Sequence, residues 1–297
     1  MLTKATTLRV FPATWHWKQC LAEARRTGYT GVELNFDGMF DLPCPARTLR
    51  AIKHDLKKHR LQAVSVYSRQ QWKTPISSPN KAKSEQGKTT LKQLIEIAAA
   101  LEAPSVLTIP GAVDNSILSP AAEQVPYDEV YDRTLRVLGE LAPLAEKKGI
   151  VLALENVPNK FLMSPLEFRD FIDRTGSRAV GCHFDVANCL YNRGYPEHWI
   201  SILGMRIKAV HFKDFRLAVG NLNGFTDIFE GDINWPEVCR ALARGHYRGP
   251  LISEVLPACK HHPETLWISA ATALDKIRQD IIQYRREMDL HGKRIPS

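Results

Sequence analysis

Residues 150–188, IVLALENVPNKFLMSPLEFRDFIDRTGSRAVGCHFDVAN, contain the pattern that recurs along the rest of the chain. Two short runs, 150–157 and 179–188, are almost continuously apolar until an acidic residue near their ends, as in strands that are covered on both faces. Between them, LEFRDFIDRTG has apolar residues three and four apart, which is typical of a helix. Ser164 and Pro165 can start this helix and Gly176 can end it. A strand, a helix and a second strand in this order predict a parallel βαβ unit with a right-handed crossover.

The same alternation continues in both directions from this unit. Counting the two runs above, eight runs of this kind alternate with helical patterns, at residues 7–14, 31–37, 61–68, 105–111, 150–157, 179–188, 207–215 and 250–257. No Gly-rich phosphate-binding loop follows any of them, which argues against a nucleotide-binding open sheet. The sequence therefore predicts an α/β fold, a single (β/α)8 TIM barrel spanning residues 1–297. Within it we expect a long loop at 69–88 and a loose tail at 290–297.

Composition and charge narrow the class of protein. With 297 residues, 44% hydrophobic and 24% charged, the chain can bury a core of the required size without disulfides, and its six cysteines show no CxxC spacing. It has no signal-peptide pattern at the N-terminus and no apolar run that could span a bilayer, so we expect a soluble, cytoplasmic protein. The net charge of +8 would suit an anionic sugar phosphate, but most basic residues lie in helical stretches mixed with acids. We therefore expect no nucleic-acid partner and no membrane partner.

Polar residues interrupt the last four apolar runs at their C-terminal ends. These residues are Glu155, Asp185, His211 and Glu254, one on each of four consecutive predicted strands. In a barrel such ends converge on one mouth, where catalytic groups gather. Three carboxylates cannot be buried together without compensation, and a divalent cation provides it. Three oxygen donors and one imidazole predict a metal site for Mn²⁺, with Mg²⁺, Co²⁺ or Zn²⁺ as alternatives.

Five short motifs resemble one known group of proteins over nearly the whole chain. They are GVELN (31–35), LEN (154–156), FDVAN (184–188), AVHFKD (209–214) and EGDINW (230–235). With them the chain resembles the xylose isomerase-like TIM-barrel superfamily of sugar isomerases and epimerases, and most of all its L-ribulose-5-phosphate 3-epimerase and ketose 3-epimerase branch. The resemblance implies that the four residues above bind the metal and that Glu155 and Glu254 also act as the acid–base pair. Relatives in this group imply a homodimer or a homotetramer.

The expected chemistry is proton transfer on a ketose or a ketose phosphate. A sugar that chelates the cation through its carbonyl and a neighbouring hydroxyl becomes acidic at the intervening carbon, and the metal-bound enediolate is stabilised. Two carboxylates on opposite faces could then invert C3, which is epimerisation. Return of the proton to the adjacent carbon would instead be isomerisation.

Further residues near the strand ends are candidates for substrate binding. This group consists of Trp15, Tyr67, Asn159, Asn188, Lys213, Arg216 and Glu230. Four of them also have a structural explanation: surface charge for Lys213 and Arg216, and aromatic core packing for Trp15 and Tyr67. His183 is expected to point into the barrel wall or to support the site without touching the metal.

Four alternatives share the barrel. One of them, a sugar-binding module without catalytic activity, would not need two carboxylates that face each other across the metal. A metal-dependent dehydratase or a hydroxypyruvate isomerase of the same superfamily would use similar ligands. An endonuclease IV-type nuclease would direct its basic charge at DNA, but it needs a multi-zinc cluster with additional histidines. The corresponding places here hold VYS, IPG and Asn188, which argues against a nuclease.

Overall fold

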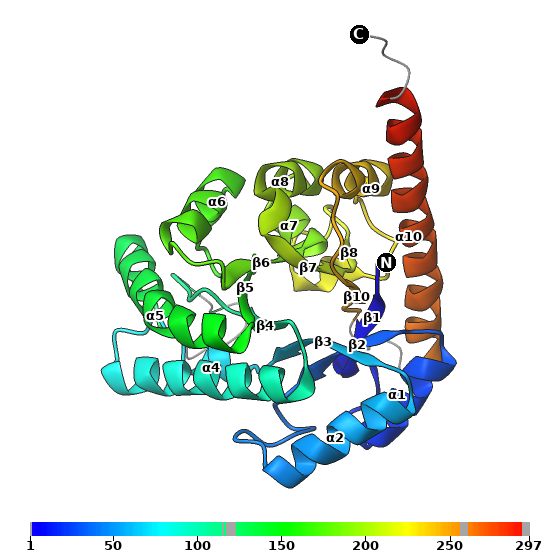
Figure 1. The fold of residues 1–297 in the computed structure, drawn as a ribbon. Helices are drawn as coiled ribbons and strands as arrows, with labels where there is room; N and C mark the ends of the chain where they lie inside the picture. Colours follow the sequence, from blue (N-terminus) through cyan, green and yellow to red (C-terminus); the bar gives the residue numbers. More distant parts are fainter. Residues whose placement is uncertain (1, 115, 117–122, 256–260, 293–297) are drawn as a thin grey trace.

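Eight parallel strands close into a barrel in the computed structural model, which describes residues 2–114, 116, 123–255 and 261–292. Around the barrel the strands follow the order β1, β10, β7, β6, β5, β4, β3, β2 (Figure 1). Their bounds are β1 Lys4–Thr7, β2 Gly31–Asn35, β3 Gln62–Tyr67, β4 Ser105–Thr108, β5 Val151–Glu155, β6 Val180–Asp185, β7 Ile207–Phe212 and β10 Leu251–Ser253. The predicted (β/α)8 barrel is confirmed.

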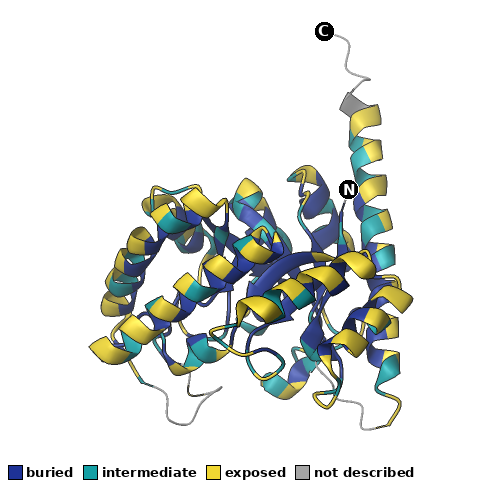
Figure 2. Cartoon of the chain, turned by 60° about the horizontal axis from the view of Figure 1, so that its bottom comes forward, coloured by how far each residue is buried: buried dark blue, intermediate teal, exposed yellow. Residues whose placement is uncertain are grey.

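Helices form an outer layer around these strands. The longer ones are α1 Trp17–Arg26, α2 Ala46–Lys58, α4 Lys81–Leu101, α5 Tyr127–Lys148, α6 Pro165–Arg174, α8 Pro196–Leu203, α9 Trp235–Arg244 and α10 Glu264–Gly292. Shorter elements at the loops are η1 Leu8–Val10, α3 Gln70–Lys73, α7 Val186–Tyr191, η2 Gly204–Arg206, η3 Leu222–Gly224 and the hairpin strands β8 Asp214–Phe215 and β9 Phe225–Thr226. The helices expose their outer faces and bury the sides that pack on the barrel (Figure 2). No helix in the described part of the chain combines the length and the hydropathy of a membrane-spanning segment.

The first strand lies earlier in the sequence than predicted. The prediction of a strand at 7–14 is wrong, because β1 ends at Thr7 and a 3-10 turn follows. The Thr7 hydroxyl caps this turn by accepting a hydrogen bond from the backbone N–H of Arg9 at 3.4 Å. As a result, Arg9 lies at the barrel mouth and not inside a strand.

Two other segments differ from the expectation. Residues 81–88 are not loop but the first two turns of α4, which begins after Asn80, whose side chain accepts a hydrogen bond from the N–H of Lys83 at 3.2 Å. At the other end of the chain, α10 continues to Gly292, into the segment predicted as a tail, and residues 293–297 lie outside the described residues.

Strand register determines which side chains fill the barrel. A small apolar cluster of Ala5, Val64, Ala209 and Ile252 occupies the interior. One step further along the strands, the register pairs Thr7 with Glu33 and Asp185 with His211. Because side chains alternate along a strand, the residues two positions after Ala5, Ala209 and Ile252 again point inward, and these are the polar residues Thr7, His211 and Glu254. The barrel interior therefore changes from apolar to polar toward its C-terminal mouth.

Candidate metal centre

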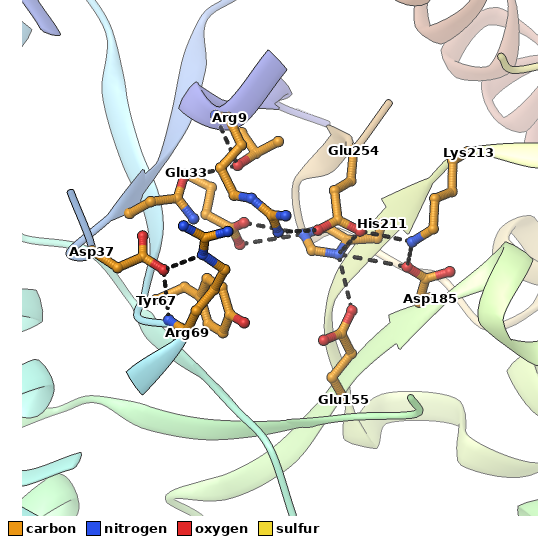
Figure 3. A network of polar contacts seen from close by, with 12 residues as sticks. Arg9, Glu33, Asp37, Tyr67, Arg69, Glu155, Asp185, His211, Lys213 and Glu254 are labelled. Carbon is orange, nitrogen blue, oxygen red and sulfur yellow. Dashed lines mark hydrogen bonds and ion pairs between the residues drawn. The ribbon is translucent and has the colours of Figure 1, made fainter. Parts of the chain in front are cut away.

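Four side chains from neighbouring strands meet at the mouth of the barrel. Glu155 ends β5, Asp185 ends β6, His211 lies in β7, and Glu254 directly follows β10. One donor atom of each lies within 4.8 Å of the others. The Nδ1 atom of His211 is 3.2 Å from Glu155 Oε1, 3.4 Å from Glu254 Oε2 and 3.7 Å from Asp185 Oδ2 (Figure 3). Three oxygen donors and one nitrogen donor at these separations fit one divalent cation.

Two cationic side chains flank this cluster. The ammonium group of Lys213 contacts Asp185 closely and donates to Glu254 Oε2 at 2.7 Å. On the other side, Nη1 of Arg9 is 3.3 Å from Glu254 Oε1. Lys213 is 8% exposed at its side chain, so the ion pair with the buried Asp185 is largely shielded from water.

The pKa values of Glu155 and Glu254 are shifted in opposite directions because their neighbours differ. Burial raises the pKa of Glu155 to about 7, although His211 opposes the shift. Burial also acts to raise the pKa of Glu254, but Lys213 and His211 outweigh it and hold that pKa well below its ordinary value. Burial acts to lower the pKa of His211, but Glu254 and Glu33 outweigh it and raise that pKa well above its ordinary value. Burial and two neighbouring acids disfavour the ionised form of Glu155, and a bound cation would remove this penalty. The donor set therefore fits the predicted metal.

These shifts give cation binding a defined pH dependence. Below pH 7, a cation must displace a proton from Glu155 and another from Nδ1 of His211. Just above pH 7, only the His211 proton remains to be displaced, because the pKa of His211 is well above its ordinary value. Affinity for Mn²⁺ should therefore rise with pH, by up to about a hundredfold per unit below pH 7 and up to about tenfold per unit just above it, since each released proton contributes a factor of ten. Isothermal titration in buffers of different ionisation enthalpy measures both the affinity and the protons released. An affinity that stays constant from pH 6 to 8 would contradict these assignments.

A cleft of about 1800 Å³ opens above the cluster. Glu155 and Glu254 lie at its base, and four of the predicted substrate-binding residues also line it: Tyr67, Asn188, Lys213 and Glu230. Tyr67 is buried and accepts a hydrogen bond from the indole N–H of Trp72 at 3.1 Å. Asn188 lies in the first turn of α7, where its backbone N–H donates to Asp185 Oδ1 at 2.7 Å.

The other three predicted substrate-binding residues are not among the described residues that line the cleft. The ring of Trp15 stacks on Phe11 at 6.0 Å between centroids, inside an aromatic cluster. Asn159 is fully buried and donates to the carbonyl of Gly111 at 2.7 Å, which connects two loops. Arg216 is exposed and reaches the cleft only through Glu230, with 3.3 Å between Nη2 and Oε2.

Two residues of the site have no counterpart among the predicted site residues. Arg9 lines the cleft, but the expected strand at 7–14 concealed its position at the mouth. Glu33 lies within the GVELN motif of β2, and its side chain reaches across the barrel to the far side of the His211 ring. The acidic residue between the apolar residues Val32 and Leu34 was the available signal. His183 is fully buried, and burial holds its pKa well below the ordinary value, so this ring is neutral.

A closed parallel barrel with ionisable side chains gathered at the C-terminal ends of its strands defines a TIM-barrel protein with its functional site at the usual mouth. The sequence model of the xylose isomerase-like TIM barrel family matches residues 21–277. The chain belongs to this family, as its motifs indicate.

Sequence similarity to individual curated proteins extends over part of the chain. An uncharacterised protein of Methanocaldococcus jannaschii is 28% identical over 174 residues, 55% of each chain. An inosose dehydratase of Bacillus cereus is 26% identical over 141 residues, 43% of this chain and 47% of the relative. The chain thus spans about half the length of the curated relatives it matches.

Solved structures match over a greater length. The structure of an L-ribulose 3-epimerase superposes with a TM-score of 0.79 at 19% identity, over 100% of both chains. A D-psicose 3-epimerase of Clostridium cellulolyticum, solved with D-tagatose, gives a TM-score of 0.77 at 15% identity, over 94% of this chain and 99% of that chain. At such identities the likeness establishes the shared fold.

Proposed function

We propose that this chain is a divalent-metal-dependent epimerase that inverts C3 of a ketose or a ketose phosphate. The observation that carries the proposal is the convergence of Glu155, Asp185, His211 and Glu254 at the base of one cleft. The similarity to sugar 3-epimerases over almost the full chain supports the same reaction class.

The four converging side chains would hold the cation, with Mn²⁺ as the expected ion. When bound, the cation would supply Lewis-acid polarisation of a ketose carbonyl and its neighbouring hydroxyl, which acidifies the C–H bond between them. The remaining chemistry falls to the protein. Lys213 and Arg9 stay protonated beside Glu254, so positive charge is available for sugar oxygens that become more negative during the reaction.

Glu155 and Glu254 are suited to exchange protons with the two faces of a sugar. They reach the cluster from β5 and from the end of β10, on two sides of His211 (Figure 3). One carboxylate would take the C3 proton, and the C–H electron pair would move into the enediolate of the sugar. The other carboxyl group would then return a proton to the opposite face of C3, which inverts that carbon and restores the carbonyl.

The rest of the cleft would select the substrate. Asn188 and Tyr67 offer polar atoms near the base, and Glu230 does so at the rim. In this proposal Asn159, Arg216 and Trp15 act only indirectly, by holding the loops and the aromatic cluster that shape the cleft.

Deuterium incorporation tests the proposed reaction. The Mn²⁺-loaded protein would be incubated in D₂O with a panel of ketoses, each with and without a 5-phosphate, and the products analysed by NMR. We expect deuterium at C3 together with the C3 epimer for at least one sugar. Deuterium at C1 or C2 would mean isomerisation in its place, and no exchange with any sugar would exclude both reactions.

A second candidate is dehydration of a keto sugar, which the similarity to inosose dehydratase favours. The same carboxylate would remove the proton next to the carbonyl, but a hydroxyl group would then leave as water. Products of this reaction are unsaturated and absorb in the ultraviolet, whereas epimers do not. The same incubations therefore distinguish the two reactions.

A further inference from the structure

Glu33 occupies an unusual place for a carboxylate, in the interior of the barrel below the candidate metal centre. It lies in β2, where its register partners are Thr7 on one side and Ser65 on the other. Only 1% of the residue is exposed. From this position the side chain crosses the barrel to β7, and both of its oxygens lie 3.3 Å from Nε2 of His211 (Figure 3).

The two nitrogens of His211 therefore face different groups. Nδ1 faces the carboxylates of Glu155, Glu254 and Asp185, whereas Nε2 faces Glu33. A neutral imidazole has one N–H and one lone pair. If Nδ1 gives its lone pair to a cation, the hydrogen must be on Nε2, where it is donated to Glu33.

We propose that Glu33 is a positioning residue that fixes the orientation and the tautomer of His211 and so strengthens cation binding at Nδ1. The inference rests on the metal site of the proposed function. A carboxylate behind a metal-binding histidine holds the ring in place and makes the opposite nitrogen a better donor. Glu33 is suited to this part because it touches the His211 ring from the side away from the cleft and is itself withdrawn from water.

His183 packs against the ring of His211 and does not form a hydrogen bond with Glu33. The two imidazoles meet edge to face, with 4.1 Å between centroids. Nε2 of His183 is 4.0 Å from Glu33 Oε2, beyond hydrogen-bonding distance, and neither ring nitrogen of His183 has a hydrogen-bond partner among the described residues. His183 therefore limits rotation of the His211 ring by contact, while Glu33 sets its hydrogen bond.

A second cation between Glu33, His183 and His211 is a competing explanation, because their donor atoms also lie within 4.8 Å of one another. It would require His211 to lose the hydrogens of both ring nitrogens. It would also upset the charge balance of the interior. One divalent cation with Lys213 and Arg9 already matches the four carboxylates, three at the centre and Glu33 below it.

Replacement of Glu33 by glutamine tests the proposal, since Glu33→Gln keeps the shape and removes the charge. Mn²⁺ affinity and stoichiometry would be measured on the full chain by competition with a chelator, without any sugar. We expect one cation per chain in both proteins and a Kd about 10- to 100-fold higher in the variant. The matched control is Ser65→Ala, which removes a buried hydroxyl from the neighbouring strand position and should leave the Kd unchanged; this hydroxyl has no hydrogen-bond partner among the described residues.

A second measurement needs no variant. In the Cd²⁺-loaded wild-type protein, nitrogen-15 NMR should show the His211 hydrogen on Nε2, with a proton shift displaced downfield by the carboxylate. A hydrogen on Nδ1 would overturn the proposal, as would an unchanged Kd in Glu33→Gln. Two cations in the wild type and one in the variant would make Glu33 a metal ligand, which also overturns it. If the wild type bound no divalent cation, the proposed function would fail as well, so the two failures are distinguishable.

Discussion

Replacing Glu254 by glutamine should lower kcat for epimerisation by about 10²- to 10⁴-fold, the range associated with the loss of a general acid or base. Lys213 and Arg9 keep this carboxylate ionised in the cleft, at 2.7 and 3.3 Å. An amide of the same shape can neither accept the C3 proton nor return one. Turnover of the preferred ketose at saturating Mn²⁺ measures the effect.

Two control variants accompany this measurement. One tests whether the metal ligand is lost, and the other tests whether loss of a carboxylate elsewhere has any effect. Glu254→Asp keeps the charge but withdraws it by one methylene, so it should retain more Mn²⁺ affinity than Glu254→Gln. Glu140→Gln changes an exposed carboxylate on α5 that pairs with Lys88, and its kcat should equal that of the wild type. If Glu254→Gln kept kcat within a few-fold of the wild type at saturating metal, Glu254 would not be the base.

Removal of the divalent cation should have an effect of similar or larger size. Stabilisation of developing charge by a cation is worth several kcal/mol, so treatment with a chelator should reduce turnover by at least about 10³-fold. Added Mn²⁺ should restore it. Activity that persists after complete chelation, verified by metal analysis, would rule out a metal-dependent reaction.

Addition of Mn²⁺ to the metal-free protein should also raise its free energy of unfolding. Cation binding to the native state alone stabilises it by about 2.7 kcal/mol when the free cation is at a hundredfold excess over Kd. The gain should be visible as a higher Tm. It should be absent in Asp185→Asn if that substitution abolishes binding, because Asp185 is a buried member of the donor set.

The sequence was most informative where a polar residue ends an apolar run. Strands β5 and β6 end at Glu155 and Asp185, and Glu254 directly follows β10, as predicted. These positions could be predicted because a barrel strand covered on both faces contains few polar residues. A single acid at the end of such a strand therefore indicates the C-terminal mouth of the barrel. No such contrast exists at the first strand, since Lys4–Thr7 reads KATT and the more apolar residues come after it.

Polar helix turns escaped prediction for a related reason. The first turns of α4 read KAKSEQGK and carry no apolar stripe, so periodicity could not separate them from a loop. Their helical state depends on the Asn80 cap and on packing of the later turns, where Leu91 and Leu94 are buried.

Contacts across the barrel could not be predicted from the sequences of the individual strands. Glu33 and His211 are 178 positions apart, and only barrel closure brings β2 opposite β7. Likewise, Arg9 reaches Glu254 because a turn redirects the chain after β1.

Anomalous diffraction from crystals soaked in Mn²⁺ tests the account most directly. We predict one peak at the base of the cleft, within bonding distance of an oxygen of Glu155, Asp185 and Glu254 and of Nδ1 of His211, with Lys213 displaced from Asp185. A peak elsewhere, or no peak at saturating Mn²⁺, would contradict the claim that these four side chains form one cation site.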